Sequence, residues 1–302
     1  MIRKIWRALL LFATAVASPL LAQSGHTNWN GWSFDWEVKD GAGLAIRNVS
    51  FNNELVLWKA SMPVIRVKYD VVNGQTCGPY ADRIYWSSLK PISWCGNNTV
   101  CQKSYVSGGH NMLELGIEAQ IGQYDLYQVW YLSQDGWLGA HLFSKGLQCQ
   151  FNHVHHPYWR MDFDINGFRD DQIFVFDNNR PNQGWGPGWM EYTNEQNDLK
   201  NPATGRVWFV RDNPTSHGIW ILPGANDGTA DSFSTKDIGA RLYQYAEDQP
   251  WPFGANGHLG YDNNEDIQEK DVVFWYVAHM QHAADQGAGV WHSSGPWMLV
   301  HR

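Results

Sequence analysis

The chain has 302 residues, of which 22 are Lys or Arg and 30 are Asp or Glu, so its net charge is −8 at pH 7. These numbers exclude nucleic acid as an expected partner, because binding it needs clustered Lys and Arg and no basic run follows the first residues. A cationic small molecule suits the negative charge better. No later stretch is long and apolar enough to cross a bilayer, so no membrane span is expected.

Residues 1–22 are typical of a secretory signal peptide. Arg3, Lys4 and Arg7 precede a short apolar run that ends in small residues at Ala22. A membrane-spanning helix would need a longer run, so we expect cleavage near Ala22. The sequence therefore predicts a secreted or periplasmic protein in which residues 23–302 form a single domain.

Short runs of β-branched and aromatic residues recur between turn residues, and few segments have the period of a helix. The clearest runs are residues 43–51, 62–72, 124–136, 205–212, 217–224 and 271–282. In the third run, Tyr127, Val129 and Tyr131 share one face, and the strand closes on a QDG turn. The pattern predicts an all-β fold, an antiparallel β-sandwich with long loops.

The cysteines number four, and in an exported chain an even number favours disulfides. Two disulfides can be paired in three ways. Cys95 and Cys101 flank the turn-like sequence GNNTV, so we expect these two to pair.

The segment FNHVHHPYWRMDFDING, residues 151–167, holds three histidines. Alternate residues of a strand point to the same face, so His153 and His155 share one face while Val154 and His156 take the other. Two imidazoles at this spacing can bind one copper or zinc ion if a third ligand comes from another strand. The alternative is that H-x-H arises by chance in a chain with 12 histidines.

Two aspartates alternate further along the same segment. Asp162 and Asp164 share a face, and their oxygen atoms suit calcium or a similar hard ion. The alternative is a solvated strand end near the DING turn.

Separated segments of the chain resemble the copper amine oxidase family. HVHHPYWRMDFDING (153–167) is similar to the family's H-x-H strand, so the resemblance implies that His153 and His155 bind copper. DVVFWYVAHMQHAAD (271–285) is similar to the strand that ends on the third copper ligand, here His282, and leaves His279 where the family has glycine. VWHSSGPWMLVHR (290–302) resembles the family's C-terminal segment.

IGQYDLYQVWYLSQDG, residues 121–136, resembles the segment whose tyrosine becomes the quinone cofactor topaquinone. The match places Tyr124 on that tyrosine, whereas Gln123 and Leu126 depart from the family pattern. The chain is shorter than a typical member, and the resemblance covers a trimmed catalytic domain from about residue 40 to 302. The chain has little room for the hairpin arms through which family members dimerise, so whether it forms a homodimer is an open question at this point.

The resemblance implies that copper and topaquinone oxidise a primary amine with O2 to an aldehyde, ammonia and hydrogen peroxide. The family's catalytic base is an aspartate in a Y-x-D-x-G-E motif. Here GPYADRIYW offers Asp82 without the G-E, and a loop aspartate paired with Arg83 or solvent is the alternative. Asp70 and Asp125 are lesser candidates.

The family also has a structural calcium site, and the resemblance places Asp162, Asp164 and Asp271 on its carboxylate ligands. Backbone carbonyls at Phe163 and Val272 would complete it. The comparison thus favours a second ion, bound by oxygen atoms.

Two other functions stay open. One is a copper redox enzyme that uses the same histidines with an unmodified Tyr124 and a substrate other than an amine. The other is a non-catalytic secreted binding module, for which the exposed aromatic loop with Trp185 and Trp189 would be the contact surface. The remaining histidines of interest are expected to be structural or solvent-exposed: His156, His279, His292 and His301.

Overall fold

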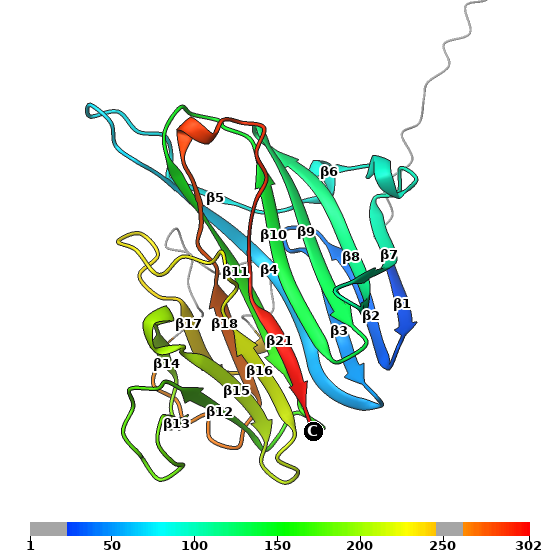
Figure 1. Cartoon of the computed structure of the whole chain (residues 1–302), viewed down its shortest axis with the longest axis vertical. Coiled ribbons are helices and arrows are strands. Elements are labelled where there is room, and N and C mark those ends of the chain that lie inside the picture. Colours follow the sequence, from blue (N-terminus) through cyan, green and yellow to red (C-terminus); the bar gives the residue numbers. More distant parts are fainter. Residues whose placement is uncertain (1–22, 246–261) are drawn as a thin grey trace, which may run out of the picture.

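The computed structural model describes residues 23–245 and 262–302 (Figure 1). The predicted signal peptide and its cleavage near Ala22 fall on residues 1–22 and lie outside the described residues. Within the described part of the chain, no helix is long and apolar enough to span a membrane.

The first sheet carries the histidine strand β11 beside the long strand β4 (Figure 1). Its order is β1-β2-β3-β4-β11-β18-β17-β14, with β5 paired to β4 and β19 paired to β11, all antiparallel. The strands are β1 (Ser24–Trp29), β2 (Trp32–Lys39), β3 (Gly43–Phe51), β4 (Glu54–Tyr69), β5 (Tyr80–Asp82), β11 (His153–Phe163), β14 (Gln196–Asp198), β17 (Ile238–Leu242), β18 (Val272–Val277) and β19 (Met280–His282).

The second sheet carries β9, the strand with Tyr124. Its order is β13-β12-β15-β16-β21-β10-β9-β8-β6, with β20 paired to β10 and β7 paired to β8, again antiparallel. The strands are β6 (Leu89–Lys90), β7 (Val100–Ser107), β8 (His110–Ile121), β9 (Tyr124–Ser133), β10 (Trp137–Lys145), β12 (Asp171–Phe176), β13 (Trp189–Tyr192), β15 (Val207–Asp212), β16 (Gly218–Leu222), β20 (His292–Ser294) and β21 (Trp297–His301). Short 3-10 turns are η1 (Trp86–Ser88), η2 (Ser93–Cys95), η3 (Pro202–Thr204) and η5 (Ala284–Gln286).

The two sheets pack face to face over a core rich in tryptophan. Trp130 of β9 meets Trp159 of β11 edge to face, with ring centroids 5.2 Å apart. Gln128, fully buried between the sheets, accepts a hydrogen bond from the Leu44 amide at 2.8 Å and donates one to the Leu44 carbonyl at 3.0 Å. The buried amide is therefore satisfied, and the predicted antiparallel β-sandwich is confirmed.

Strand β4 is longer than the sequence pattern predicts. The predicted strand begins at residue 62, but β4 begins at Glu54 and continues through Pro63. The register against β11 shifts between Tyr158 and Arg160, opposite this proline. Proline has no N–H to donate to the sheet, so a bulge tolerates it without losing a ladder hydrogen bond.

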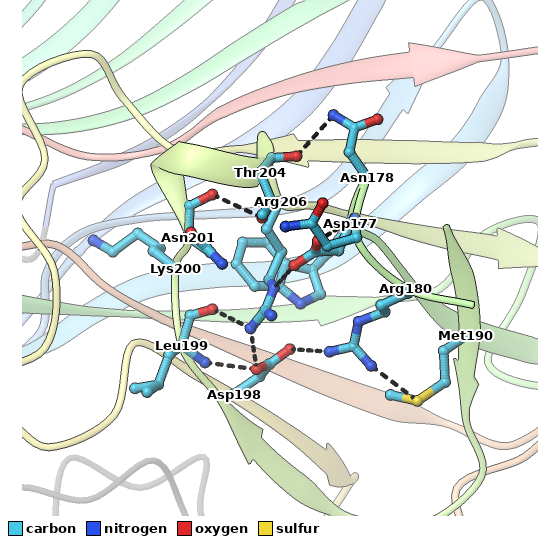
Figure 2. Close-up of polar contacts among 12 residues, drawn as sticks. Asp177, Asn178, Arg180, Met190, Asp198, Leu199, Lys200, Asn201, Thr204 and Arg206 are labelled. Carbon is cyan, nitrogen blue, oxygen red and sulfur yellow. Dashed lines mark hydrogen bonds and ion pairs between the residues drawn. The ribbon is translucent and has the colours of Figure 1, made fainter. Parts of the chain in front are cut away.

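Charged side chains join the two sheets at the end formed by β12 to β15 (Figure 2). Arg206 donates through Nε to Asp177 Oδ2 and through Nη1 to Asp198 Oδ1, both at 2.7 Å. Arg180 Nη2 donates to the other oxygen of Asp198 at 3.5 Å. Asp198 belongs to β14 of the first sheet and Arg206 precedes β15 of the second, so the guanidinium groups tie the sheets together there.

Two disulfides are present. Cys95 pairs with Cys101, as the sequence predicts, and Cys77 pairs with Cys149. The second bond joins the loop after β4 to the segment before β11, so it ties the chain together at the end of β11 that carries His153.

Candidate active site

Strand β11 separates its histidines onto two faces, as its alternation predicts. His153 and His155 point between the sheets, where their ring centroids lie 5.4 and 4.8 Å from the ring of Tyr124. His156 points to the opposite face and its Nδ1 lies 2.8 Å from Nδ1 of His279. The first two imidazoles and the phenol therefore share one buried site, which a one-residue shift in register would destroy.

His282 joins this site from β19. The register pairs it directly with His153, and the two ring centroids lie 4.7 Å apart. The rings of His153 and His155 are 4.9 Å apart. His279 falls on the other face, as expected from its spacing to His282.

The hydrogen bonds of the rings leave nitrogen atoms available to a metal ion. Nδ1 of His153 lies 3.2 Å from the carbonyl of Phe151, and Nε2 of His282 lies 3.2 Å from that of Gly287. A ring N–H donated to a backbone carbonyl leaves the other ring nitrogen as an acceptor. Within the described residues, buried Nε2 of His153 and both ring nitrogens of His155 have no hydrogen-bond partner.

Burial keeps two of these imidazoles neutral. It lowers the pKa of His153 to about 4, aided by the neighbouring His282 and His292 and opposed by the Phe151 carbonyl. The pKa of His155 falls well below its usual value for the same main reason. Neutral imidazoles with unpartnered nitrogens fit a copper or zinc ion in chemical type.

The ligand atoms of the three imidazoles are not drawn fully together. Among the described residues, one group of three or more His, Cys, Asp or Glu has ligand atoms all within 4.8 Å of one another, and that group is Asp162, Asp164 and Asp271. The histidine rings are nevertheless neighbours at the site, with centroids of successive rings 4.9 and 4.7 Å apart.

Tyr124, at the start of β9, is held by a second tyrosine. Its hydroxyl lies 2.6 Å from the hydroxyl of Tyr69 and accepts a hydrogen bond from the backbone N–H of Gln148 at 3.3 Å. Tyr69 ends β4, pairs with His153 in register and stacks on its ring at 5.0 Å. No sequence motif marks Tyr69, because its position at the site depends on the pairing of β4 with β11.

The phenol of Tyr124 favours its protonated form in this environment. Burial raises its pKa, and the charge of Asp82 adds to the rise, while the hydrogen bonds from Tyr69 and Gln148 oppose it. A dication at the histidines would favour the phenolate and lower this pKa.

Asp82 is the best placed of the three candidate bases. It lies on β5, opposite Ile65 of β4, close enough for its charge to raise the pKa of both Tyr69 and Tyr124. Burial raises the pKa of Asp82 itself. Its side chain lines a cavity of about 580 Å³ together with Tyr85, Gln120 and Gly122, next to the turn before Tyr124.

The other two aspartates are engaged elsewhere. Asp125 pairs with Lys90 at 2.7 Å and with Lys145 at 3.4 Å. Asp70 is exposed and accepts a hydrogen bond from Asn152 Nδ2 at 3.2 Å. Neither contact directs a carboxylate at Tyr124.

Asp162, Asp164 and Asp271 gather at the opposite end of β11, as the resemblance implied. Burial and the charge of Asp162 raise the pKa of Asp164 to about 7, while Arg160 Nη1 donates to Asp162 Oδ2 at 3.3 Å. Asp171, which the sequence analysis did not single out, lies nearby, and burial and Asp164 raise its pKa to about 10. So many buried carboxyl groups fit a hard cation bound by oxygen.

No protein-family model and no curated protein matches the sequence. Solved structures do match. A copper-containing benzylamine oxidase from Hansenula polymorpha is 13% identical with a TM-score of 0.72, covering 99% of this chain and 63% of that one. An Aspergillus nidulans amine oxidase is 15% identical with a TM-score of 0.65, and the match covers 98% of this chain and 55% of that one. The Pichia pastoris lysyl oxidase is 12% identical with a TM-score of 0.63, and the match covers 98% of this chain and 56% of that one.

The chain therefore spans between 55% and 63% of the length of these three structures. The structural match also includes residues before residue 40, where the sequence motifs placed the start of the resemblance. Over nearly its whole length, the chain has the β-sandwich fold of the copper amine oxidases.

Proposed function

We propose that the chain is an exported copper-dependent oxidase that deaminates primary amines through a topaquinone derived from Tyr124. The products are an aldehyde, ammonia and hydrogen peroxide, with O2 as the oxidant. The observation that carries this proposal is the contact of the Tyr124 ring with His153 and His155, two buried imidazoles that have unpartnered nitrogens within the described residues. The two disulfides support the exported location.

His153, His155 and His282 would hold the copper through neutral nitrogen atoms. When bound, the copper and the quinone supply oxygen activation and an electron sink for the amine. The Tyr69 hydroxyl and the Gln148 amide orient the Tyr124 ring through its oxygen. Burial between the sheets excludes water from this ring, which is 3% exposed.

Asp82 would take the proton from the carbon next to the amine nitrogen. Its raised pKa brings the carboxylate closer to the range in which a general base works well near neutral pH. The cavity of about 580 Å³ that it lines extends to Gly122, in the turn before Tyr124, and would hold a small amine there. The negative net charge of the protein attracts a protonated amine to the surface.

Asp162, Asp164 and Asp271 would hold a structural calcium-like ion, with the carbonyls of Phe163 and Val272 as further ligands. The ion would offset the repulsion among the carboxylates and fix the end of β11. We further propose that residues 23–302 form a single domain that carries both metal sites.

A second function is favoured by one observation. Tyr124 is hydrogen-bonded to Tyr69 and its pKa is raised, so the site favours the neutral phenol over the phenolate. A copper redox enzyme that uses this tyrosine unchanged, on a substrate other than an amine, is therefore the alternative.

Mass spectrometry of the peptide that contains Tyr124, after exposure of the protein to copper and oxygen, tests the proposal. Topaquinone adds two oxygen atoms and removes two hydrogen atoms, and phenylhydrazine should then label the same residue. An unaltered Tyr124 in a protein that binds copper would reject the quinone and support the alternative. A protein that binds no copper would reject both.

A further inference from the structure

A fourth imidazole lies against the histidine cluster. His292 begins β20, which pairs with β10 in the second sheet, opposite Ser144. Its ring centroid is 4.1 Å from that of His282, with 33° between the ring planes. His292 therefore approaches from the sheet that carries Tyr124, whereas His153, His155 and His282 all come from the other sheet.

The distances between successive rings match those between neighbouring ligands of one ion, although no three of these histidines have ligand atoms within 4.8 Å of one another in the described structure. A metal–nitrogen bond of about 2 Å places a ring centroid roughly 3 Å from the metal, so adjacent ligands have centroids roughly 4–5 Å apart. The rings form a continuous series in which successive centroids are 4.9, 4.7 and 4.1 Å apart, in the order His155, His153, His282, His292. His292 is also close enough for its charge to act on His153 and His155.

One ring nitrogen of His292 is available as a metal ligand. Its Nε2 is buried and, within the described residues, has no hydrogen-bond partner. A buried polar atom without a partner costs free energy unless a ligand, ion or water satisfies it. Stacking on His282 accounts for the position of the ring but leaves this nitrogen unexplained.

We propose that His292 supplies a fourth nitrogen ligand to the copper ion held by His153, His155 and His282. This inference rests on the proposed copper site. Four nitrogen ligands suit the tetragonal geometry that Cu(II) prefers. His292 also lines a cavity of about 470 Å³ with Trp291, so the ring has room to move away from the ion and would be an exchangeable ligand.

Two substitutions separate a ligand from a stacking partner. His292→Phe keeps a flat ring beside His282 but removes the nitrogen, whereas His292→Ala removes both. The control is His301→Ala, because His301 is exposed on β21 and its ring contacts Phe209. The full-length protein is titrated with Cu(II), and the nitrogen hyperfine structure of its electron paramagnetic resonance spectrum is recorded.

A ligand role predicts a four-nitrogen spectrum for the wild type and His301→Ala. It predicts a three-nitrogen spectrum for both His292 variants, and a copper affinity at least about 10-fold lower than that of the wild type. Free imidazole should restore the fourth nitrogen in His292→Ala. A three-nitrogen wild-type spectrum, or His292→Phe indistinguishable from wild type, would overturn this inference and leave the proposed function standing. A wild-type protein that binds no copper would overturn both.

Discussion

The two ends of strand β11 present clusters of opposite character. At one end, His153 and His155 are buried as neutral rings, so they can lie together without charge repulsion. At the other end, Asp162 and Asp164 are buried carboxyl groups, and burial, aided by the charge of Asp162, raises the pKa of Asp164 to about 7. The candidate nitrogen ligands of the proposed copper site thus lie at one end of this strand, and the candidate oxygen ligands of the proposed calcium-like site lie at the other.

Burial has opposite consequences for the two clusters. Burial prepares the imidazoles for a metal, because only the neutral ring can donate its lone pair. Burial opposes the charged carboxylates, so the acidic cluster needs a cation to ionise fully. We therefore expect the imidazoles to be neutral without metal, and the aspartate end to be stabilised by its ion.

The largest effect should come from removing one ligand at each end. His155→Ala should lower copper affinity by more than about 100-fold, because a ligand contributes more than the 10–100-fold known for outer-shell partners. Asp164→Asn should leave copper affinity unchanged. It should also abolish the increase that calcium gives to the free energy of unfolding, which for the wild type is about 2.7 kcal/mol at a calcium concentration of 100 times Kd. Titration calorimetry and thermal unfolding measure both. Loss of both metals in either variant would mean that the clusters are not independent.

Next in size is the effect of the base beside the histidine end. Asp82→Asn should reduce amine oxidation by about 10²–10⁴-fold while copper content and the mass of the Tyr124 peptide stay as in the wild type. Asp70→Asn is the matched control and should change the rate little, since its carboxylate faces Asn152. Steady-state peroxide release measures the rate. Equal losses in both variants would remove Asp82 from its role.

The clusters should also give the metal-free protein two opposite pH dependences. His153 has a folded pKa of about 4, below its unfolded value of about 6.5, so its contribution to stability is lost as pH falls through that range. Asp164 has a folded pKa of about 7, above its unfolded value of about 3.9, so its contribution is lost as pH rises through that range. Each difference of one unit changes the free energy of unfolding by about 1.4 kcal/mol.

Urea unfolding of the metal-free protein between pH 4 and pH 7 tests these signs. As pH rises, the free energy of unfolding of Asp164→Asn should increase relative to that of the wild type. Over the same range, the free energy of unfolding of His153→Asn should decrease relative to that of the wild type. Parallel curves for the three proteins would contradict the charge states assigned to both ends.

The smallest effect should come from Tyr69. Tyr69→Phe removes the 2.6 Å hydrogen bond to Tyr124 but keeps the ring that stacks on His153. A lost hydrogen bond between neutral groups is worth about 1 kcal/mol, so formation of the cofactor should slow roughly 5-fold. The absorbance of the quinone after copper addition follows this rate. An unchanged rate would show that Tyr69 does not orient the phenol.

The sequence predicts the features that depend on local alternation. The β-sandwich, the opposite faces of His155 and His156, and the pairing of Cys95 with Cys101 all follow from short-range patterns. Tyr69 and His292 were missed as members of the site, because each arrives through a strand pairing between distant segments. The register between strands that are distant in the sequence cannot be predicted from the residues of one strand alone.

The metal site itself can be tested most directly by a crystal structure of the copper-loaded protein with anomalous diffraction at the copper edge. We expect one strong peak between the two sheets, about 2 Å from nitrogen atoms of His153, His155 and His282 and beside the Tyr124 ring. A peak elsewhere, or His282 directed away from the ion, would contradict it.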